Sequence, residues 1–555
     1  MNMACFNRLP LRWPEIILCL SLIIVTVLHI PLSVFPMGRD QGVWATAGMA
    51  INEGAVFFKD YLHFNLPGLG FSYALAFQFV DDPGTAGMLV NLAGSLLMIL
   101  GMYLLLKETV SKSAAAWSVI IFSILWPVTI GFWDIAQKDF MAMYGVLIGT
   151  GLMARAENTS HLRRLCIYGG GFFIGLSMMY KPIFAIAGIM LAALHTGKFL
   201  LAKKHADEKS LAYLITDLLV LLAGPVTIAL VFISYLFVGD GITNAYKGIF
   251  HFARAYSMLT EASWQELTGI LIFRSWLLGN PINWYALLPA LLWPVLLGAG
   301  VYSFFIKGSI KSSLFFVPFL TSLFTYFIQG KGFVYHAAPW QICIIMIAGS
   351  GLAWAWGKNK NTGKQKLSSD LLLPCILTVI LGVVFFRAMF MTRYINVDVP
   401  AWSGSLDRDI YLENHFRISD SIPLPSENER LAAWIKTNSQ DDDLILVWGL
   451  ECQIYVLSDR LYATNAPFDV ILSSLSLEGS KAEKWQMEMR EQFIVSLREQ
   501  QPKFIVIVSN NANFMTPLPS NESVALVPGF QSLLDRHYTK VKTLGLFDVY
   551  QYAGD

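Results

Sequence analysis

Long apolar stretches recur along the first 391 residues and alternate with short polar segments. A straight helical crossing of a bilayer needs about 20 apolar residues, and several stretches reach that length. The pattern predicts a mainly α-helical, polytopic membrane protein with about eleven transmembrane helices. The expected spans are 14–35, 84–106, 114–132, 140–154, 165–180, 182–197, 211–238, 284–306, 313–328, 338–356 and 371–391. The two stretches around Lys181 are also compatible with one re-entrant hairpin.

The polar segments between the stretches are unequal in length. The segment 35–83 is long and amphipathic, and we expect two helices in it along the membrane surface, at 41–53 and 67–80. A further surface helix is expected within 239–283. The chain up to residue 391 is therefore predicted to be one transmembrane domain with surface helices in its first outer loop.

The chain becomes polar after Met391. Residues 392–425 are expected to form a linker, and Ser426 with Glu429 predicts a capping box that starts a helix. Alternating helices and strands then predict a small soluble α/β domain over 426–555. The expected helices are 426–438 and 482–499, and the expected strands are 443–448, 503–509 and one near 541–551.

Composition and charge support a membrane protein and indicate its orientation. Hydrophobic residues make up 55% of the chain and charged residues 14%, against about 25% charged in soluble domains. The net charge of +1 gives no reason to expect a nucleic-acid partner. With the N-terminus in the cytoplasm, inner segments hold about twice as many Lys and Arg as outer ones, which predicts an outer C-terminal domain. No pair of histidines has zinc-ligand spacing, and the soluble domain has no GxGxxG or P-loop motif that would predict a nucleotide.

Asp40 is the first candidate for chemistry, because it lies just past the first span at the start of an expected helix. The helix dipole favours an ionised carboxylate there. An ionised carboxylate at a lipid–water boundary can take a proton from a hydroxyl group. The alternative is a structural role as a helix cap or as an ion-pair partner of Arg39.

Two lysines are candidates for binding an anion. Lys181 lies between apolar runs and precedes Pro182, and a lone lysine at membrane depth is costly unless it snorkels or meets an anion. Lys331 lies between Gly330 and Gly332, whose backbone can approach an anion closely. For Lys331 the alternative is an ordinary solvated loop charge.

The run RDQGVWATAGMAINEGAVFFKDYLHFNLPG, residues 39–68, resembles the first outer loop of the GT-C membrane glycosyltransferases. The resemblance is to the bacterial branch related to protein O-mannosyltransferases and the lipid A aminoarabinose transferase, glycosyltransferase families 39 and 83. It implies that Asp40 is the catalytic base or orients the acceptor, and that Asp60 and Tyr61 contact substrate. Two positions differ: Gln41 stands where the family often has a second acid, and Asn65 where many relatives have a lysine.

The resemblance extends to two further segments. Within 133–139, Asp139 matches an acidic family position and is implied to be a second catalytic residue, and Lys138 is a candidate phosphate contact. The element around Lys181 is similar to one in which a lysine contacts the lipid phosphate. The alternatives are a helix cap or solvated loop residue for Asp139 and an ordinary loop lysine for Lys138.

The loop 329–339 also resembles a family element. It implies that Lys331 and His336 contact the donor phosphate and that Tyr335 stacks on or hydrogen-bonds to the sugar. For Tyr335 the alternative is an interfacial aromatic belt. The segment 447–460 resembles part of the soluble domain of these enzymes.

The resemblance implies transfer of a sugar from a polyprenyl-phosphate donor, with inversion, to a hydroxyl or phosphate acceptor on the non-cytoplasmic face. A glycan, a lipid or a protein would serve as acceptor, in a bacterial inner membrane with the C-terminal domain periplasmic or extracellular. A lipid phosphate leaving group carries little charge compared with a nucleotide diphosphate, so we predict no metal or cofactor, while a metal bridging Asp40 and Asp139 stays open. The alternatives are a transporter or flippase of lipid-linked sugars, and a non-enzymatic sensor or assembly factor.

Overall fold

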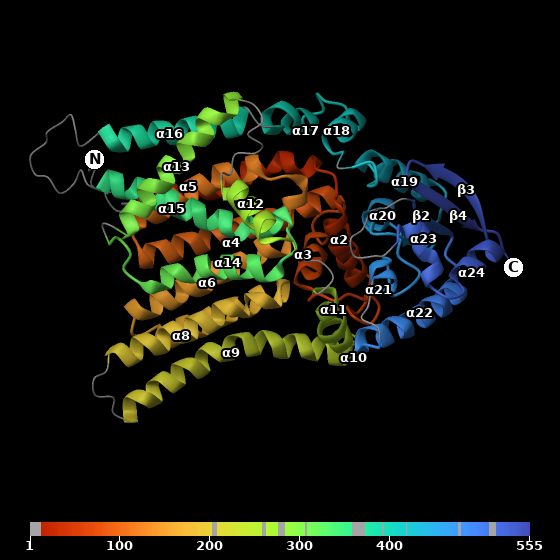
Figure 1. The fold of residues 1–555 in the computed structure, drawn as a ribbon, viewed down its shortest axis with the longest axis horizontal. Coiled ribbons are helices and arrows are strands. Elements are labelled where there is room, and N and C mark those ends of the chain that lie inside the picture. Colours follow the sequence, from red (N-terminus) through yellow and green to blue (C-terminus); the bar gives the residue numbers. More distant parts are fainter. Residues whose placement is uncertain are drawn as a thin grey trace, which may run out of the picture.

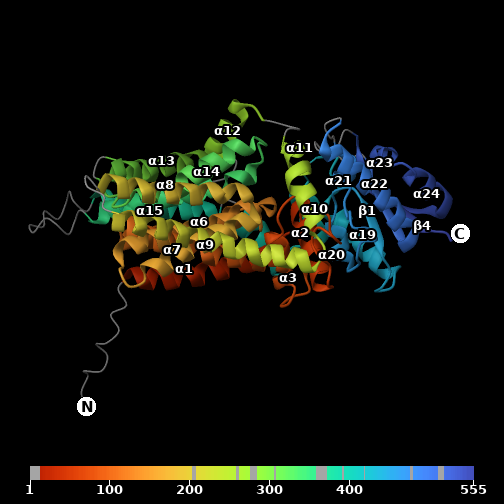
Figure 2. The same ribbon diagram turned by 90° about the horizontal axis from the view of Figure 1, so that it is seen from below.

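The molecule has a helical bundle at one end and the C-terminal domain at the other (Figure 1). The first outer loop, with α2 (Arg39–Asn52) and α3 (Gly68–Ala76), lies between them, and the orthogonal view keeps this order (Figure 2). The structure is a computed structural model that describes residues 13–202, 208–257, 262–275, 284–305, 308–357, 372–390, 393–417, 419–474, 479–509 and 518–554.

Each predicted span contains one long helix of the bundle. These helices are α1 (Trp13–His29), α4 (Pro83–Thr109), α5 (Lys112–Thr129), α6 (Lys138–Asn158), α7 (Arg163–Tyr180), α8 (Ala185–Ala202), α9 (Glu208–Val238), α13 (Trp284–Phe305), α14 (Phe316–Gln329), α15 (Ala338–Gly357) and α16 (Leu372–Phe390). Among the described residues, 7 helical stretches are long and apolar enough to cross a membrane, and the chain is an integral membrane protein. The number of about eleven crossings and their orientation stay predictions.

Helices α6 and α7 are not among those 7 stretches. Their close packing explains why they can be less apolar than helices that face lipid. α6 is buried along most of its length by its neighbours, so its side chains meet protein more than lipid. A Cβ added at Gly149 would lie 2.8 Å from the carbonyl oxygen of Gly170, which shows how closely α6 and α7 approach. α7 and α8 have 18 residues each and are joined by η4 (Pro182–Phe184), and this length favours two crossings over one re-entrant hairpin.

Short helices and turns connect the bundle on both sides. In the segment predicted to hold a further surface helix lie α10 (Ile242–Tyr246), the π-helix η5 (Lys247–Phe252), α11 (Ala253–Ser257) and α12 (Trp264–Ser275). Besides η4, the short 3-10 turns of the bundle are η2 (Ile30–Val34), η3 (Phe132–Asp134), η6 (Ser313–Phe315) and η7 (Val334–Ala337).

Helix α2 is covered by protein. The prediction that it lies open on the membrane surface is therefore wrong. Most of its side chains are buried, because α3 packs on one side and the C-terminal domain on another. The Arg39 guanidinium lies 2.6 Å from the Glu451 carboxylate, and the Thr46 hydroxyl donates to the Cys452 carbonyl over 2.8 Å. Arg39, Gly42 and Thr46 recur every three to four residues and therefore share one face of α2.

The C-terminal domain contains a four-stranded mixed sheet in the order β1-β2-β4-β3. β1 pairs with β2 in parallel, and β4 is antiparallel to both β2 and β3. The last predicted strand is instead a hairpin, β3 and β4, that turns at Gly545 with a φ of 54°. The strands are β1 (Ile445–Trp448), β2 (Phe504–Val508), β3 (Tyr538–Leu544) and β4 (Phe547–Tyr552). The helices and turns are α19 (Pro425–Thr437), α20 (Gln453–Ser458), α21 (Val470–Ser473), α22 (Lys481–Gln500), α23 (Ser520–Ser523), η10 (Val524–Leu526) and α24 (Phe530–His537).

The predicted capping box at Ser426 and Glu429 is wrong, because the cap lies two residues earlier, at Leu424 and Glu427. The helix begins at Pro425, a residue favoured at the first helical position, and Ser426 lies inside it. The Glu427 carboxylate accepts the backbone N–H of Leu424 over 3.1 Å, which satisfies a free donor at the helix start.

The segment 392–425 holds three short helices between the bundle and the sheet domain. They are η9 (Tyr394–Asp398), a π-helix, α17 (Val399–Trp402) and α18 (Arg408–His415). Arg393 lies 2.8 Å from Asp398, and the Tyr411 hydroxyl donates to the same carboxylate over 3.0 Å. The predicted linker is therefore a packed connection, while the domain boundaries themselves stay predictions.

Replacing Gly42 with alanine is expected to loosen the contact between α2 and the C-terminal domain. A Cβ at this position would overlap the backbone of Gln453 in α20, and overpacking typically costs about 1–3 kcal/mol. Hydrogen exchange of the α2 and α20 amides should be faster in Gly42→Ala than in the wild type. Gly197→Ala is the matched control, because a Cβ there has no described atom within 4 Å. Equal exchange in both variants would contradict a tight α2–α20 contact.

Candidate functional site

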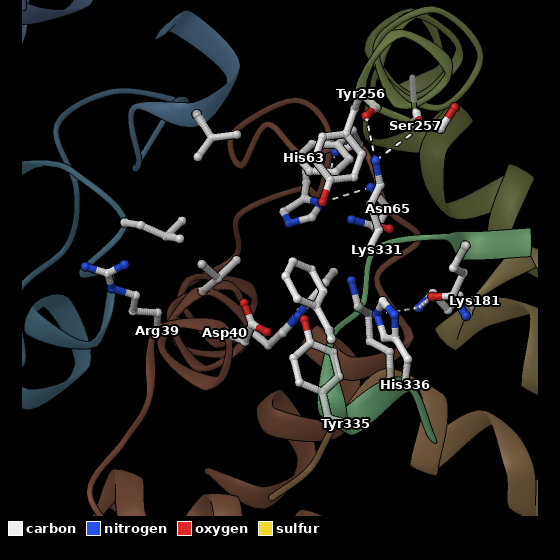
Figure 3. Close-up of a pocket in the computed structure, with 18 of the residues that line it drawn as sticks. Arg39, Asp40, His63, Asn65, Lys181, Tyr256, Ser257, Lys331, Tyr335 and His336 are labelled. Carbon is white, nitrogen blue, oxygen red and sulfur yellow. Dashed lines mark hydrogen bonds between the residues drawn. The ribbon is translucent and has the colours of Figure 1, made fainter. Parts of the chain in front are cut away.

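A cavity of about 430 Å³ lies where the bundle, the first outer loop, α11 and the C-terminal domain meet (Figure 3). Most of the residues singled out from the sequence line it, although they come from four separate segments of the chain. They are Asp40, Lys138, Lys181, Lys331, Tyr335 and His336. The structure thus brings together the candidate base and the candidate phosphate-binding residues.

Asp40 reaches the cavity because of its place in α2. The helix begins at Arg39 after an extended Gly38, so Asp40 lies in the first turn. Val43 and Trp44 lie three and four residues after Asp40, so both neighbour it on the helix surface, and all three line the cavity. The Tyr335 hydroxyl donates a hydrogen bond to the half-buried Asp40 carboxylate, and Figure 3 shows the two side chains side by side.

Gln41 has a structural role that an acidic residue could not perform. Its side-chain nitrogen donates to the carbonyl oxygens of Phe132 and Ile135, each over 2.9 Å. A carboxylate accepts hydrogen bonds and cannot donate to carbonyls. This position therefore fastens the loop 132–135 to α2, which accounts for the departure from the family pattern.

The Lys181 ammonium is held at the cavity wall by a network of polar side chains. It lies 2.7 Å from the Asp139 carboxylate, donates to the Gln329 side-chain oxygen and lies 3.4 Å from His336 Nε2. The Gln329 amide nitrogen in turn donates to Asp139 over 3.1 Å. Lys181 lines the cavity, whereas Asp139 is fully buried behind it. This geometry favours a positioning role for Asp139 and gives no support to the predicted catalytic role.

Lys331 lies on a backbone segment that depends on its two glycines. Gly330 and Gly332 have φ angles of 60° and 68°, in the left-handed region that glycine adopts without steric cost. The Lys331 ammonium donates to the carbonyls of Tyr256 and Ser257, over 3.3 and 3.1 Å, and lies 4.9 Å from the centre of the Tyr256 ring. The loop therefore holds a cation at the cavity wall.

Two further groups set the charge of the cavity. The Lys138 ammonium lies 5.0 Å from the centre of the Trp44 ring. Burial and the nearby Asp40 charge raise the pKa of the Tyr256 hydroxyl, which therefore stays neutral. Among the described residues that line the cavity, Arg39, Lys138, Lys181 and Lys331 are basic and Asp40 alone is acidic. Asp139 and Glu451 balance two of these cations from behind, so the site has an excess of positive charge.

Asp60 and Tyr61 do not line the cavity. The Asp60 carboxylate accepts the backbone N–H of Val56 over 2.8 Å, and the buried Tyr61 hydroxyl donates to the Val43 carbonyl over 2.5 Å. Both side chains shape the first outer loop, and the substrate contacts predicted for them have no support from this geometry. Within the described part of the chain, no group of three or more metal-ligating side chains is found.

Several cavity residues were missed by sequence reasoning. Gln329 ends α14 and lies two residues before Lys331, beside the two glycines, so its position was a usable signal. His63 lies between Leu62 and Phe64, Tyr256 lies between Ala255 and Ser257, and neither carries a spacing signal. Leu450 and Phe468 line the cavity from the C-terminal domain, about 400 residues away from Asp40, and no local pattern could place them there.

The fold and the site define a membrane protein of the GT-C glycosyltransferase fold, which confirms the resemblance drawn from the sequence at the level of the fold. No family model and no curated protein matches the sequence. The likeness lies in solved structures, at 12 to 13% sequence identity, and shows the fold alone.

Two of these structures are of ArnT from Cupriavidus metallidurans. The one bound to undecaprenyl phosphate has a TM-score of 0.58 at 12% identity, and the apo state 0.56 at 13% identity; each comparison covers 97% of both chains. The third is the archaeal oligosaccharyltransferase AglB from Archaeoglobus fulgidus, in complex with an inhibitory peptide and a dolichol-phosphate. It has a TM-score of 0.53 at 13% identity and covers 98% of this chain and 74% of AglB.

Proposed function

We propose that the chain is a membrane glycosyltransferase that takes a sugar from a polyprenyl-phosphate donor and passes it to a hydroxyl or phosphate acceptor. The observation that carries the proposal is the single cavity that joins Asp40 to Lys138, Lys181 and Lys331. A carboxylate facing several cations, beside a membrane bundle, matches the needs of an acceptor hydroxyl and a lipid phosphate. The solved ArnT and AglB structures that carry a polyprenyl phosphate or dolichol-phosphate support the same class of donor.

The charge of the cavity supports a monophosphate-linked donor. Arg39 and Lys181 are each paired with a buried carboxylate, so Lys138 and Lys331 face the single lining carboxylate, Asp40, among the described residues. A phosphodiester carries one negative charge. Its arrival would bring a partly dry site close to neutrality, where electrostatic interactions are strong.

An exposed apolar stripe on α14 supports a lipid chain as part of the donor. Leu320, Phe324 and Ile328 are 52%, 40% and 58% exposed and recur every four residues, on one face of the helix. Ile328 lines the cavity, and the next residue is Gln329, the partner of Lys181. A polyprenyl chain lying along this stripe would bring its phosphate to the lysines.

The chemistry follows from these positions. Asp40 accepts the proton of the acceptor hydroxyl as its oxygen bonds to the anomeric carbon of the sugar. The bond from that carbon to the phosphate oxygen breaks on the opposite side, which inverts the anomeric centre. The polyprenyl phosphate leaves with an added negative charge, which Lys331, Lys138 and Lys181 stabilise. Tyr335 orients the Asp40 carboxylate through its hydrogen bond.

The topology completes the proposal. The bundle through residue 391 would carry the catalysis, 392–425 would connect it, and 426–555 would form a soluble domain on the periplasmic or extracellular side. The N-terminus would lie in the cytoplasm of a bacterial cell, and the acceptor would be a glycan, a lipid or a protein at the outer face of the inner membrane. The excess of basic residues in the inner segments supports this orientation.

Mass spectrometry of membrane lipids and glycans, with and without the protein, tests the function. Loss of the protein should remove one sugar from an acceptor and let a polyprenyl-phosphate sugar build up. Unchanged lipids and glycans would contradict the proposal. A transporter or flippase would also change them, but it would restore the glycan when carrying Asp40→Asn, whereas the transferase would not.

A further inference from the structure

One side of the cavity is lined by aromatic side chains and not by the lysines proposed to bind the phosphate. It is formed by Trp44, His63, Phe64, Tyr256 and Phe468, which we call the aromatic wall. The ring centroid of His63 lies 4.6 Å from the ring centroid of Trp44, 4.9 Å from that of Phe64 and 5.6 Å from that of Phe468. The wall therefore combines apolar ring faces with one imidazole.

The hydrogen bonds of His63 fix which ring nitrogen carries the proton. Nδ1 accepts the backbone N–H groups of Phe64 and Asn65, each over 2.9 Å. A nitrogen that accepts hydrogen bonds is unprotonated, so the proton of the neutral ring lies on Nε2. Burial and the nearby Lys138 charge lower the pKa of His63 well below its usual range, which agrees with a neutral ring.

The free edge of this ring faces the cavity. Figure 3 shows His63 with Nδ1 bonded to Asn65 and its other nitrogen directed toward the open space beside Asp40. Nε2 has no hydrogen-bond partner within the described ranges, and His63 is itself a lining residue with 4% exposure. His63 Nε2–H is thus an oriented, neutral donor that can bind an acceptor atom of a ligand in the cavity.

The aromatic wall adjoins the position proposed for the phosphate. The Lys331 ammonium lies 4.9 Å from the centre of the Tyr256 ring. The Tyr256 ring centre lies 5.0 Å from that of Phe64, and Phe64 follows His63 in the chain. The group beside the phosphate in such a donor is its first sugar ring. The C–H faces of a sugar ring pack against aromatic faces, and its hydroxyl oxygens accept hydrogen bonds.

We infer that the aromatic wall is the subsite for the donor's sugar, that His63 Nε2–H donates to one of its hydroxyl oxygens, and that this sugar is uncharged. The inference rests on the proposed function and deepens it. An amino sugar would bring an ammonium group to a wall where Lys138 already lies over Trp44 and where the one imidazole offers a donor. A neutral hexose or pentose meets neither a like charge nor an unmatched donor.

Binding of three lipids to the full chain in nanodiscs tests this subsite. The lipids are polyprenyl phosphate, polyprenyl-phosphate hexose and a polyprenyl-phosphate 4-amino sugar. The wild type should bind the hexose lipid more tightly than the bare phosphate, with no such gain for the amino sugar. In His63→Asn the gain from the hexose should fall about 3- to 10-fold, the range expected for one lost hydrogen bond, while affinity for the bare phosphate is kept.

The variants separate the cavity contact from the local turn. The asparagine side chain can still accept the Phe64 and Asn65 N–H groups, as in an Asx-turn, but it is too short to replace Nε2. His63→Gln reaches the position of Nε2 and should keep part of the hexose gain. His161→Asn is the control, because His161 is exposed between α6 and α7.

Three results would overturn the inference. They are an unchanged hexose gain in His63→Asn, tighter binding of the amino sugar than of the hexose, and a hexose gain lost equally in His63→Gln. If the wild type fails to bind even bare polyprenyl phosphate, the proposed function fails with it. If it binds the phosphate but gains nothing from the hexose, only the sugar subsite fails.

Discussion

Replacing Asp40 with asparagine is expected to reduce sugar transfer by about 10²- to 10⁴-fold, the range that a general base contributes. The asparagine side chain has the same shape and can still accept the Tyr335 hydroxyl, but it cannot take a proton from the acceptor. Donor binding should persist, because the lysines remain in place. Transfer is measured as release of polyprenyl phosphate from the lipid-linked sugar by the full chain in membranes.

The control for this variant is Asp82→Asn. The exposed Asp82 caps α4 by accepting the Thr85 N–H over 2.7 Å, and asparagine caps helices equally well. This variant should transfer sugar like the wild type. Wild-type transfer by a folded Asp40→Asn protein would show that Asp40 is not the base.

Replacing Lys181 with methionine should have two separate effects. It leaves the Asp139 carboxylate fully buried without its ion-pair partner, which costs about 3–5 kcal/mol of stability. It also removes one cation from the phosphate position, which should weaken binding of polyprenyl phosphate by about 30-fold or more. Thermal unfolding in detergent measures the first effect, and lipid binding in nanodiscs the second.

The double variant Lys181→Met with Asp139→Asn separates these effects. It removes the uncompensated charge, and the asparagine can keep a hydrogen bond with Gln329, so stability should largely return. Lipid binding should stay weak. Recovery of binding together with stability would mean that Lys181 serves the fold alone.

The transmembrane part of the fold was predictable because its signal is local. Each long apolar stretch forms one helix, and the ends differ by a few residues, as at α4 (Pro83–Thr109) against the predicted 84–106. The hairpin of β3 and β4 was missed because Gly545 lies in a run that otherwise has one continuous strand pattern. The setting of α2 was missed because its cover comes from the C-terminal domain, far away in the chain.

The site was predictable only where a polar group stands out from its surroundings. Asp40 at a helix start, Lys181 within apolar runs and Lys331 between glycines each had a physical reason to be noticed, and all three line the cavity. The sequence did not indicate that Asp139 would be buried against Lys181, since that contact joins residues 42 positions apart. His63 was missed because its proposed role depends on two backbone hydrogen bonds and on Phe468, a neighbour from the C-terminal domain.

The most direct test of a shared cavity around a lipid phosphate is a cryo-EM structure of the full chain in nanodiscs with polyprenyl phosphate. We expect the phosphate within hydrogen-bonding distance of Lys331 and of Lys138 or Lys181, the lipid chain along Leu320, Phe324 and Ile328, and Asp40 facing the same space. A phosphate bound elsewhere, with this cavity empty or Asp40 turned away from it, would contradict the account.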